Sequence, residues 1–235
     1  DHNGNILLSN TQKGKRVMKE STAFLLTDAM KDVITKGTGK SAKLSSSMAV
    51  AGKSGTTSNS YDYWFSGYTP YHTASVWMGY DKNTNFASDN THKKIWAKVM
   101  NEIIKTKQEQ TTDFKKPADI VKAKVCKESG KLAIKGVCDH DPRGSRVITE
   151  YFEKGTVPTQ TCDIHVAVEV CKTSDKLATK NCPANKKQRK IYIVRKKGSH
   201  GKTADSPYML PKKYQSVFCK KHYCLLYTSP SPRDG

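Results

Sequence analysis

The chain has 235 residues, a hydrophobic content of 36% and a formal net charge of +20, which suits a folded, rather polar and strongly basic protein. No apolar run reaches the roughly 18 residues that a membrane-spanning helix needs, so the sequence contains no such helix. The lysines are concentrated in the second half without the interleaved aromatic residues of a nucleic-acid platform, which argues against nucleic acid. Their charge suggests an anionic wall polymer or lipid surface as a partner, although ordinary solvated lysines give the same pattern.

The first half predicts a helix, three strands and a second helix, in that order. Gly37 ends the first helix, whose apolar positions are spaced three and four residues apart. Strands are predicted at 49–57, 63–69 and 73–80, joined by short turns that favour an antiparallel sheet. The second helix has one apolar face, formed by Ile95, Trp96, Val99, Met100, Ile103 and Ile104. The order predicts an α+β fold with helices packed on the sheet.

The first of these strands carries Lys53-Ser54-Gly55-Thr56. Alternation along a strand places Lys53 and Gly55 on one face and the two hydroxyls on the other. A lysine supplies positive charge, hydroxyls donate hydrogen bonds, and glycine lets a substrate backbone approach closely. The tetrad therefore favours a site for a carboxylate and a developing oxyanion, although alone it also fits an ordinary edge strand.

The surrounding motifs strengthen the functional interpretation. Gly37-Thr-Gly39, Lys53-Ser-Gly-Thr56, Trp64-Phe-Ser-Gly-Tyr68 and Val76-Trp-Met-Gly-Tyr80 occur in this order. Together they resemble the C-terminal end of the transpeptidase domain of class A penicillin-binding proteins, a penicillin-binding/β-lactamase-like fold. The resemblance implies peptidoglycan cross-linking by serine acyl transfer at the outer face of the cell membrane, without a cofactor. It also implies D-Ala-D-Ala stem peptides as substrates, β-lactams as covalent mimics, and a glycosyltransferase half outside this chain.

Roles follow from the resemblance residue by residue. Lys53 would be the lysine of the third family motif, and the backbone N–H of Thr56 an oxyanion-hole donor. The hydroxyls of Ser54 and Thr56 would hold the substrate carboxylate beside Gly55. Thr57 is a weaker candidate for lining the cleft.

The family nucleophile is the serine of an S-x-x-K motif, and a second motif reads S-x-N. Both are expected before Asp1, so we expect the chain to lack the nucleophile and to be inactive alone. Ser58-Asn59-Ser60 follows the lysine motif and is interpreted as a polar turn. The same strand motif also fits a D,D-carboxypeptidase or a penicillin-sensing receptor, and the basic second half fits a non-catalytic wall-binding module.

The second half contains an internal repeat. Lys124-Val-Cys-Lys-Glu-Ser-Gly-Lys-Leu-Ala133 matches Glu169-Val-Cys-Lys-Thr-Ser-Asp-Lys-Leu-Ala178, which predicts two small β-rich modules. The final segment resembles one reading frame of a transposase-type sequencing adapter and is interpreted as an artefact. The predicted divisions are a transpeptidase fragment at 1–108, a linker at 109–118, Cys-containing repeats at 119–165 and 166–223, and the artefact at 224–235.

The cysteines of the repeats are the last candidate residues. The pairs Cys126/Cys138 and Cys171/Cys182 lack C-x-x-C spacing, and His140 or His165 fits loosely as an added ligand. This spacing argues against a zinc site. Loop-closing disulfides in an exported protein are favoured instead, each worth about 3 kcal/mol in the chain-entropy view.

Overall fold

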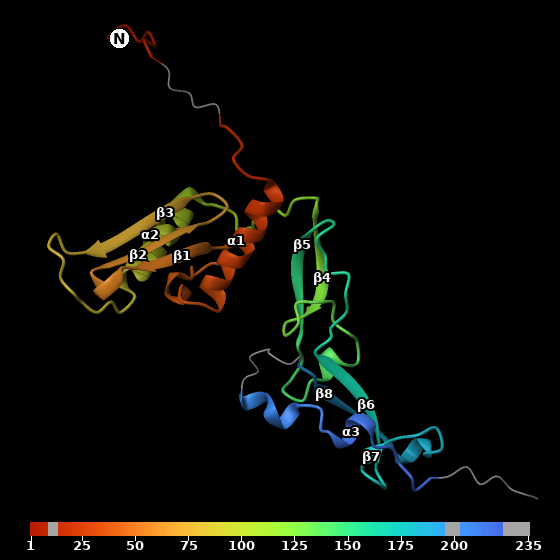
Figure 1. Ribbon diagram of the computed structural model, residues 1–235. Coiled ribbons are helices and arrows are strands. Elements are labelled where there is room, and N and C mark those ends of the chain that lie inside the picture. The colour runs from red at the N-terminus through yellow and green to blue at the C-terminus, as the bar shows by residue number, and fades with distance from the viewer. Residues whose placement is uncertain (9–13, 196–202, 223–235) are drawn as a thin grey trace, which may run out of the picture. The chain divides into compact units, whose positions relative to one another are not determined.

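The computed structural model describes residues 1–8, 14–195 and 203–222 (Figure 1). The expected adapter-derived segment, 224–235, lies outside these residues. The chain divides into two compact units, residues 1–121 and 122–235. Within the described ranges, no helix combines the length and the apolar character needed to cross a membrane.

The first unit is built from the five elements that the sequence predicts. Its helices are α1 (Glu20–Thr35) and α2 (Thr91–Lys107), and its strands are β1 (Ala51–Thr56), β2 (Asp62–Tyr68) and β3 (Thr73–Gly79). Short 3-10 turns cover Lys40–Ala42 and Ser58–Ser60, so Ser58-Asn-Ser60 is a turn, as expected. The strands form one antiparallel sheet in the order β1-β2-β3, which confirms the α+β arrangement.

The sheet register explains which side chains enter the core. Ser54 of β1 lies opposite Phe65, which lies opposite Val76, whereas Lys53 lies opposite Ser66 on the other face. Phe65 is fully buried against Trp96 of α2, with ring centroids 5.2 Å apart. α2 packs against β2 and β3, while α1 packs along β1 (Figure 1).

Two facing glycines make room for this packing. Gly52 and Gly67 are cross-strand partners on the side of the sheet that carries Phe65. A Cβ atom on Gly67 would lie 2.7 Å from the Phe65 ring and 2.8 Å from the Trp96 ring. The buried Trp96 indole donates a 2.9 Å hydrogen bond to the carbonyl of Ala74, so its polar group is satisfied.

The second unit consists of short strands and turns. Its strands are β4 (Ile120–Cys126, which begins in the last residues of the first unit), β5 (Val147–Glu153), β6 (His165–Cys171), β7 (Lys176–Leu177) and β8 (Lys187–Ile193). The other elements are 3-10 turns at Cys138–His140, Ala184–Lys186 and Thr203–Tyr208, and the short helix α3 (Lys213–Ser216). β4 pairs with β5, and β6 lies between β7 and β8.

The second unit has small cores made largely of cysteine. One buried cluster joins Cys126, Cys138 and Cys162, and another joins Cys171, Cys182 and Cys219. The first unit, in contrast, buries a cluster of ten residues that includes Trp96 and Phe65. The two units therefore differ in what fills their interiors.

Candidate functional site

The strand β1 presents its polar residues at the edge of the sheet. β1 has a strand neighbour only on its β2 side within the described sheet. Lys53 and Thr56 are exposed, and Ser54 and Gly55 are half-buried. The Lys53 ammonium donates a 2.6 Å hydrogen bond to the carbonyl of Ser54, which holds it beside the strand. One ammonium group and two hydroxyl groups thus lie along this short edge segment.

Thr38, in the loop after α1, contacts this strand through its side chain. The Thr38 hydroxyl lies 2.9 Å from the Ser54 hydroxyl. Gly37 and Gly39, on either side of Thr38, donate backbone hydrogen bonds to the last turns of α1. Thr38 belongs to the motif Gly37-Thr-Gly39, but it was not predicted as a site residue.

The carboxylate of Asp62 fixes the far end of β1. The Thr57 hydroxyl donates to Asp62 Oδ2 at 3.1 Å, and the Trp77 indole donates to Asp62 Oδ1 at 2.9 Å. The Asp62 N–H donates to the Thr57 hydroxyl at 2.9 Å. Thr57, expected to line the cleft, therefore already uses its hydroxyl to close the turn between β1 and β2.

A second lysine contributes to the electrostatics of this strand. Lys93, in the first turn of α2, is buried and donates a 2.7 Å hydrogen bond to Asn90 Oδ1. Burial lowers the pKa of the Lys93 ammonium, and the charge of Lys53 lowers it further. Lys93 and Lys53 are therefore close enough for their ammonium groups to repel each other.

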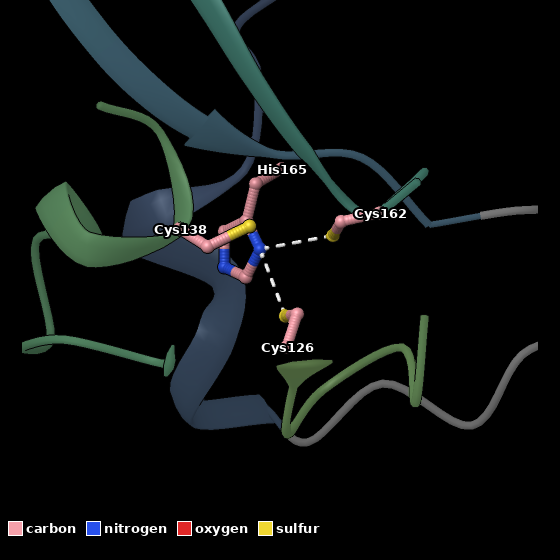
Figure 2. Close-up of side chains that lie close together, drawn as sticks. All are labelled: Cys126, Cys138, Cys162 and His165. Atoms are coloured by element: carbon pink, nitrogen blue, oxygen red, sulfur yellow. Dashed lines mark hydrogen bonds between the residues drawn. The ribbon is translucent and has the colours of Figure 1, made fainter. Parts of the chain in front are cut away.

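The second unit gathers potential metal ligands at two places. In the first, Cys126, Cys138, Cys162 and His165 place their ligand atoms within 4.8 Å of one another (Figure 2). All four side chains are buried. The Nδ1 atom of His165 lies 3.4 Å from Cys126 Sγ and 3.3 Å from Cys162 Sγ.

The thiols of this first group differ in acidity. Burial acts to raise the pKa of the Cys162 thiol, but hydrogen bonds with Ser129 and His165 outweigh it and lower this pKa to about 6. Burial raises the pKa of the Cys138 thiol to about 12. Cys162 is therefore the first of the two to become a thiolate.

The second group has the same composition. Cys171, Cys182, Cys219 and His222 place their ligand atoms within 4.8 Å of one another. The Nδ1 atom of His222 lies 3.6 Å from Cys171 Sγ and 3.5 Å from Cys219 Sγ. His222 is half-buried, whereas the three cysteines are buried.

The cysteines are grouped differently from the two pairs that the sequence favours. All six cysteines in the described part of the chain are free, so neither Cys126–Cys138 nor Cys171–Cys182 forms a disulfide in the structure. Taken as pairs, the cysteines of each repeat lack the spacing of a metal site. The structure instead adds a third cysteine and a histidine from a distant segment, Cys162-x-x-His165 or Cys219-x-x-His222. The repeated C-x-x-H spacing was the available sequence signal.

Comparison with known proteins places the chain in a family. The family described as "Penicillin binding protein transpeptidase domain" matches residues 6–105, and "Penicillin-binding protein 1A, C-terminal domain" matches residues 116–167. Penicillin-binding protein 1A of Clostridium botulinum is 34% identical over 217 residues, which cover 90% of this chain and 25% of that protein. The chain belongs to the class A penicillin-binding proteins.

A second curated relative and one solved structure also align with the chain. Penicillin-binding protein 1A of Clostridium perfringens is 36% identical over 173 residues, covering 72% of this chain and 20% of the relative. A crystal structure of Penicillin-Binding Protein 1A from Haemophilus influenzae aligns with a TM-score of 0.47 and 25% identity, covering 63% of this chain and 22% of that one. The chain spans about a quarter of the length of the curated relatives that it matches.

An S-x-x-K pattern does occur in the chain, but it follows the lysine motif. Ser199 and Lys202 do match S-x-x-K, so the chain is not free of that pattern. Both residues lie outside the described ranges, and they follow the Lys53 motif by more than a hundred positions. The family resemblance implies the reverse order, with the nucleophile before the lysine motif. Ser199 therefore does not occupy the position in the sequence where the family serine is expected.

Proposed function

We propose that β1 forms the carboxylate-binding wall of a serine D,D-transpeptidase that cross-links peptidoglycan. The observation that carries this proposal is the exposed Lys53-Ser-Gly-Thr56 edge, set within the segment that matches the transpeptidase family. In this function, Lys53 and the hydroxyls of Ser54 and Thr56 hold the terminal carboxylate of a D-Ala-D-Ala stem peptide. A β-lactam occupies the same place as a mimic of that peptide.

The local geometry supports a division of roles along the strand. The Thr56 N–H is proposed as an oxyanion-hole donor, and loss of one such donor typically costs about 10² to 10³ in rate. Gly55 leaves space for a substrate backbone, because a Cβ atom there would meet only the Trp64 side chain, at 3.4 Å. Thr38 is added as a positioning residue, since its hydroxyl contacts Ser54 rather than the open edge. Thr57 remains the outermost candidate, with its hydroxyl directed to Asp62.

The nucleophile is proposed to come from a preceding segment of the same protein, on the outer face of the cell membrane. The 235-residue chain alone is then expected to show no covalent labelling by a fluorescent penicillin, because it offers a binding wall without the acylated serine. Stoichiometric labelling of this chain would contradict the proposal.

The positive test uses the protein encoded together with its upstream coding sequence. There, Lys53→Ala is expected to slow penicillin acylation by about 10² or more, since the ammonium that holds the carboxylate is removed. Lys94→Ala is the matched control, because Lys94 is an exposed lysine of α2 that pairs with Asp89. Equal acylation rates in Lys53→Ala and the control would refute the assigned role. Analysis of the peptide products would separate cross-linking from carboxypeptidase cleavage.

A further inference from the structure

We propose that the second unit holds two structural Zn²⁺ ions, one in each cysteine–histidine group. This inference is independent of the transpeptidase proposal, because it rests on residues outside the segment that carries β1. The ligands of the first site are Cys126, Cys138, Cys162 and His165, and those of the second are Cys171, Cys182, Cys219 and His222.

The distances within the groups fit a tetrahedral ion. With Zn–S near 2.3 Å and Zn–N near 2.0–2.1 Å, a tetrahedral site separates a nitrogen from a sulfur by about 3.6 Å and two sulfurs by about 3.8 Å. The four nitrogen–sulfur separations in the structure run from 3.3 to 3.6 Å. In each group, all ligand atoms lie within 4.8 Å of one another, as a single shared ion requires.

The composition of each group favours a metal over disulfides. Three cysteines converge at one point, so any disulfide would leave one thiol unpaired and the histidine without a role. Three thiolates and one imidazole, in contrast, form a complete Cys₃His set, which is a common structural zinc site. Four protein ligands leave no open position for a substrate, so the ions would serve folding rather than catalysis.

The surroundings of the first site orient its ligands. The His165 Nε2 atom, on the side of the ring away from the sulfurs, lies 2.6 Å from Asp141 Oδ2. Arg143 donates to both oxygens of the same buried carboxylate, at 3.0 and 2.6 Å. A carboxylate behind the histidine fixes its tautomer and presents Nδ1 to the metal, as in many zinc sites.

In each group, a backbone N–H also donates a hydrogen bond to the sulfur of the second cysteine. The Ile134 N–H donates to Cys138 Sγ at 3.3 Å, and the Thr179 N–H donates to Cys182 Sγ at 3.4 Å. An N–H group directed at sulfur stabilises a thiolate and therefore suits a metal ligand. Corresponding residues make this contact in both groups.

The two sites share a wider backbone framework. Gly130 N–H donates to the Cys126 carbonyl at 2.8 Å, and Asp175 N–H donates to the Cys171 carbonyl at 2.9 Å. Both donors have positive φ, +68° at Gly130 and +49° at Asp175. Further along each copy, Cys162 N–H donates to Leu132 and Cys219 N–H donates to Leu177. Two separate stretches of sequence thus build the same ligand cage, which is unexpected for a chance gathering of thiols.

The first experiment measures the zinc content of the 235-residue chain, purified in the presence of zinc and then dialysed. Two zinc ions per chain are expected by elemental analysis. His165→Ala and His222→Ala are each expected to lose one ion. His140→Ala is the matched control, because this exposed histidine lies beside the first group without belonging to it, and it should keep both ions. Less than one ion per unaltered chain, or loss of zinc in the control alone, would overturn the proposal.

A second measurement needs no variant and so does not depend on how the variants fold. Replacing zinc by Co²⁺ in the unaltered chain is expected to give intense thiolate-to-cobalt absorption and the visible bands of a tetrahedral ion, with two equivalents at saturation. Mass spectrometry without reduction should find Cys126, Cys138, Cys162, Cys171, Cys182 and Cys219 as thiols after acid release of the metal. Disulfides among these cysteines together with no cobalt spectrum would refute the assignment.

Discussion

At the scale of single residues, Asp62 shows how one carboxylate can define the end of the proposed binding strand. It accepts hydrogen bonds from the Thr57 hydroxyl and the Trp77 indole, which lie on opposite sides of β2. Its own N–H donates back to Thr57. The position of the residue after Thr56 is therefore tied to the sheet by side-chain as well as backbone bonds.

Asp62→Ala is expected to lower the free energy of unfolding of the first unit by about 1–2 kcal/mol, because two side-chain hydrogen bonds are lost. Urea unfolding followed by tryptophan fluorescence measures this unit alone, since all three tryptophans lie in it. Asp81→Ala, at an exposed position, is the control and should change stability by less than about 0.5 kcal/mol. Equal stability of the two variants would show that the Asp62 contacts contribute nothing to the free energy of unfolding.

At the residue scale, the sequence supports a site hypothesis where the chemistry is contained in a short motif. Lys53, Ser54 and Thr56 could be selected because they are adjacent and their neighbours follow a family pattern. Thr38 was missed because its contact with Ser54 depends on where the chain turns after α1. The group around His222 was missed for a related reason: Cys219 is only three residues away from it, but Cys171 is 51 residues away in the sequence.

At the scale of elements, the sheet of the first unit depends on small residues in β1 and β2. Gly52 and Gly67 face each other where Phe65 and Trp96 fill the space between sheet and helix. The sequence predicted the strands and α2 from periodicity, which is a local property. It could not predict which glycines face the core, because that depends on strand register.

Gly67→Ala is expected to lower the free energy of unfolding of the first unit by about 1–3 kcal/mol, because the added methyl group overlaps two packed rings. The measurement is again urea unfolding by tryptophan fluorescence. Gly14→Ala is the control, since a Cβ atom there meets nothing within 4 Å. A Gly67→Ala protein as stable as the control would mean that the rings move aside without cost.

At the scale of the whole molecule, the two units are stabilised in different ways. The first has a hydrophobic core with large aromatic and aliphatic side chains, whereas the second buries two cysteine clusters with a few apolar neighbours. Small domains with little core commonly need a metal or disulfides for stability. The sequence indicated a cross-linked second half through its cysteines and favoured disulfides, whereas the free cysteines of the structure lead us to propose metal ions as the links.

A strong zinc chelator is therefore expected to act on one unit only. The tryptophan-detected unfolding of the first unit should keep its midpoint, while a separate calorimetric transition of the second unit should disappear or move to much lower temperature. Restoring zinc should restore that transition. A chelator that shifts both transitions equally, or shifts neither of them, would contradict this prediction.

The strand β6 links the two proposed zinc sites directly. His165, a ligand of the first site, begins this strand, and Cys171, a ligand of the second, ends it. The six steps between them span about 20 Å, and the even spacing directs both side chains to the same face. If β6 slipped by one residue against β8, both ligands would turn to the opposite face. With both proposed ions bound, the second unit would therefore tolerate only one alignment of β6 against β8.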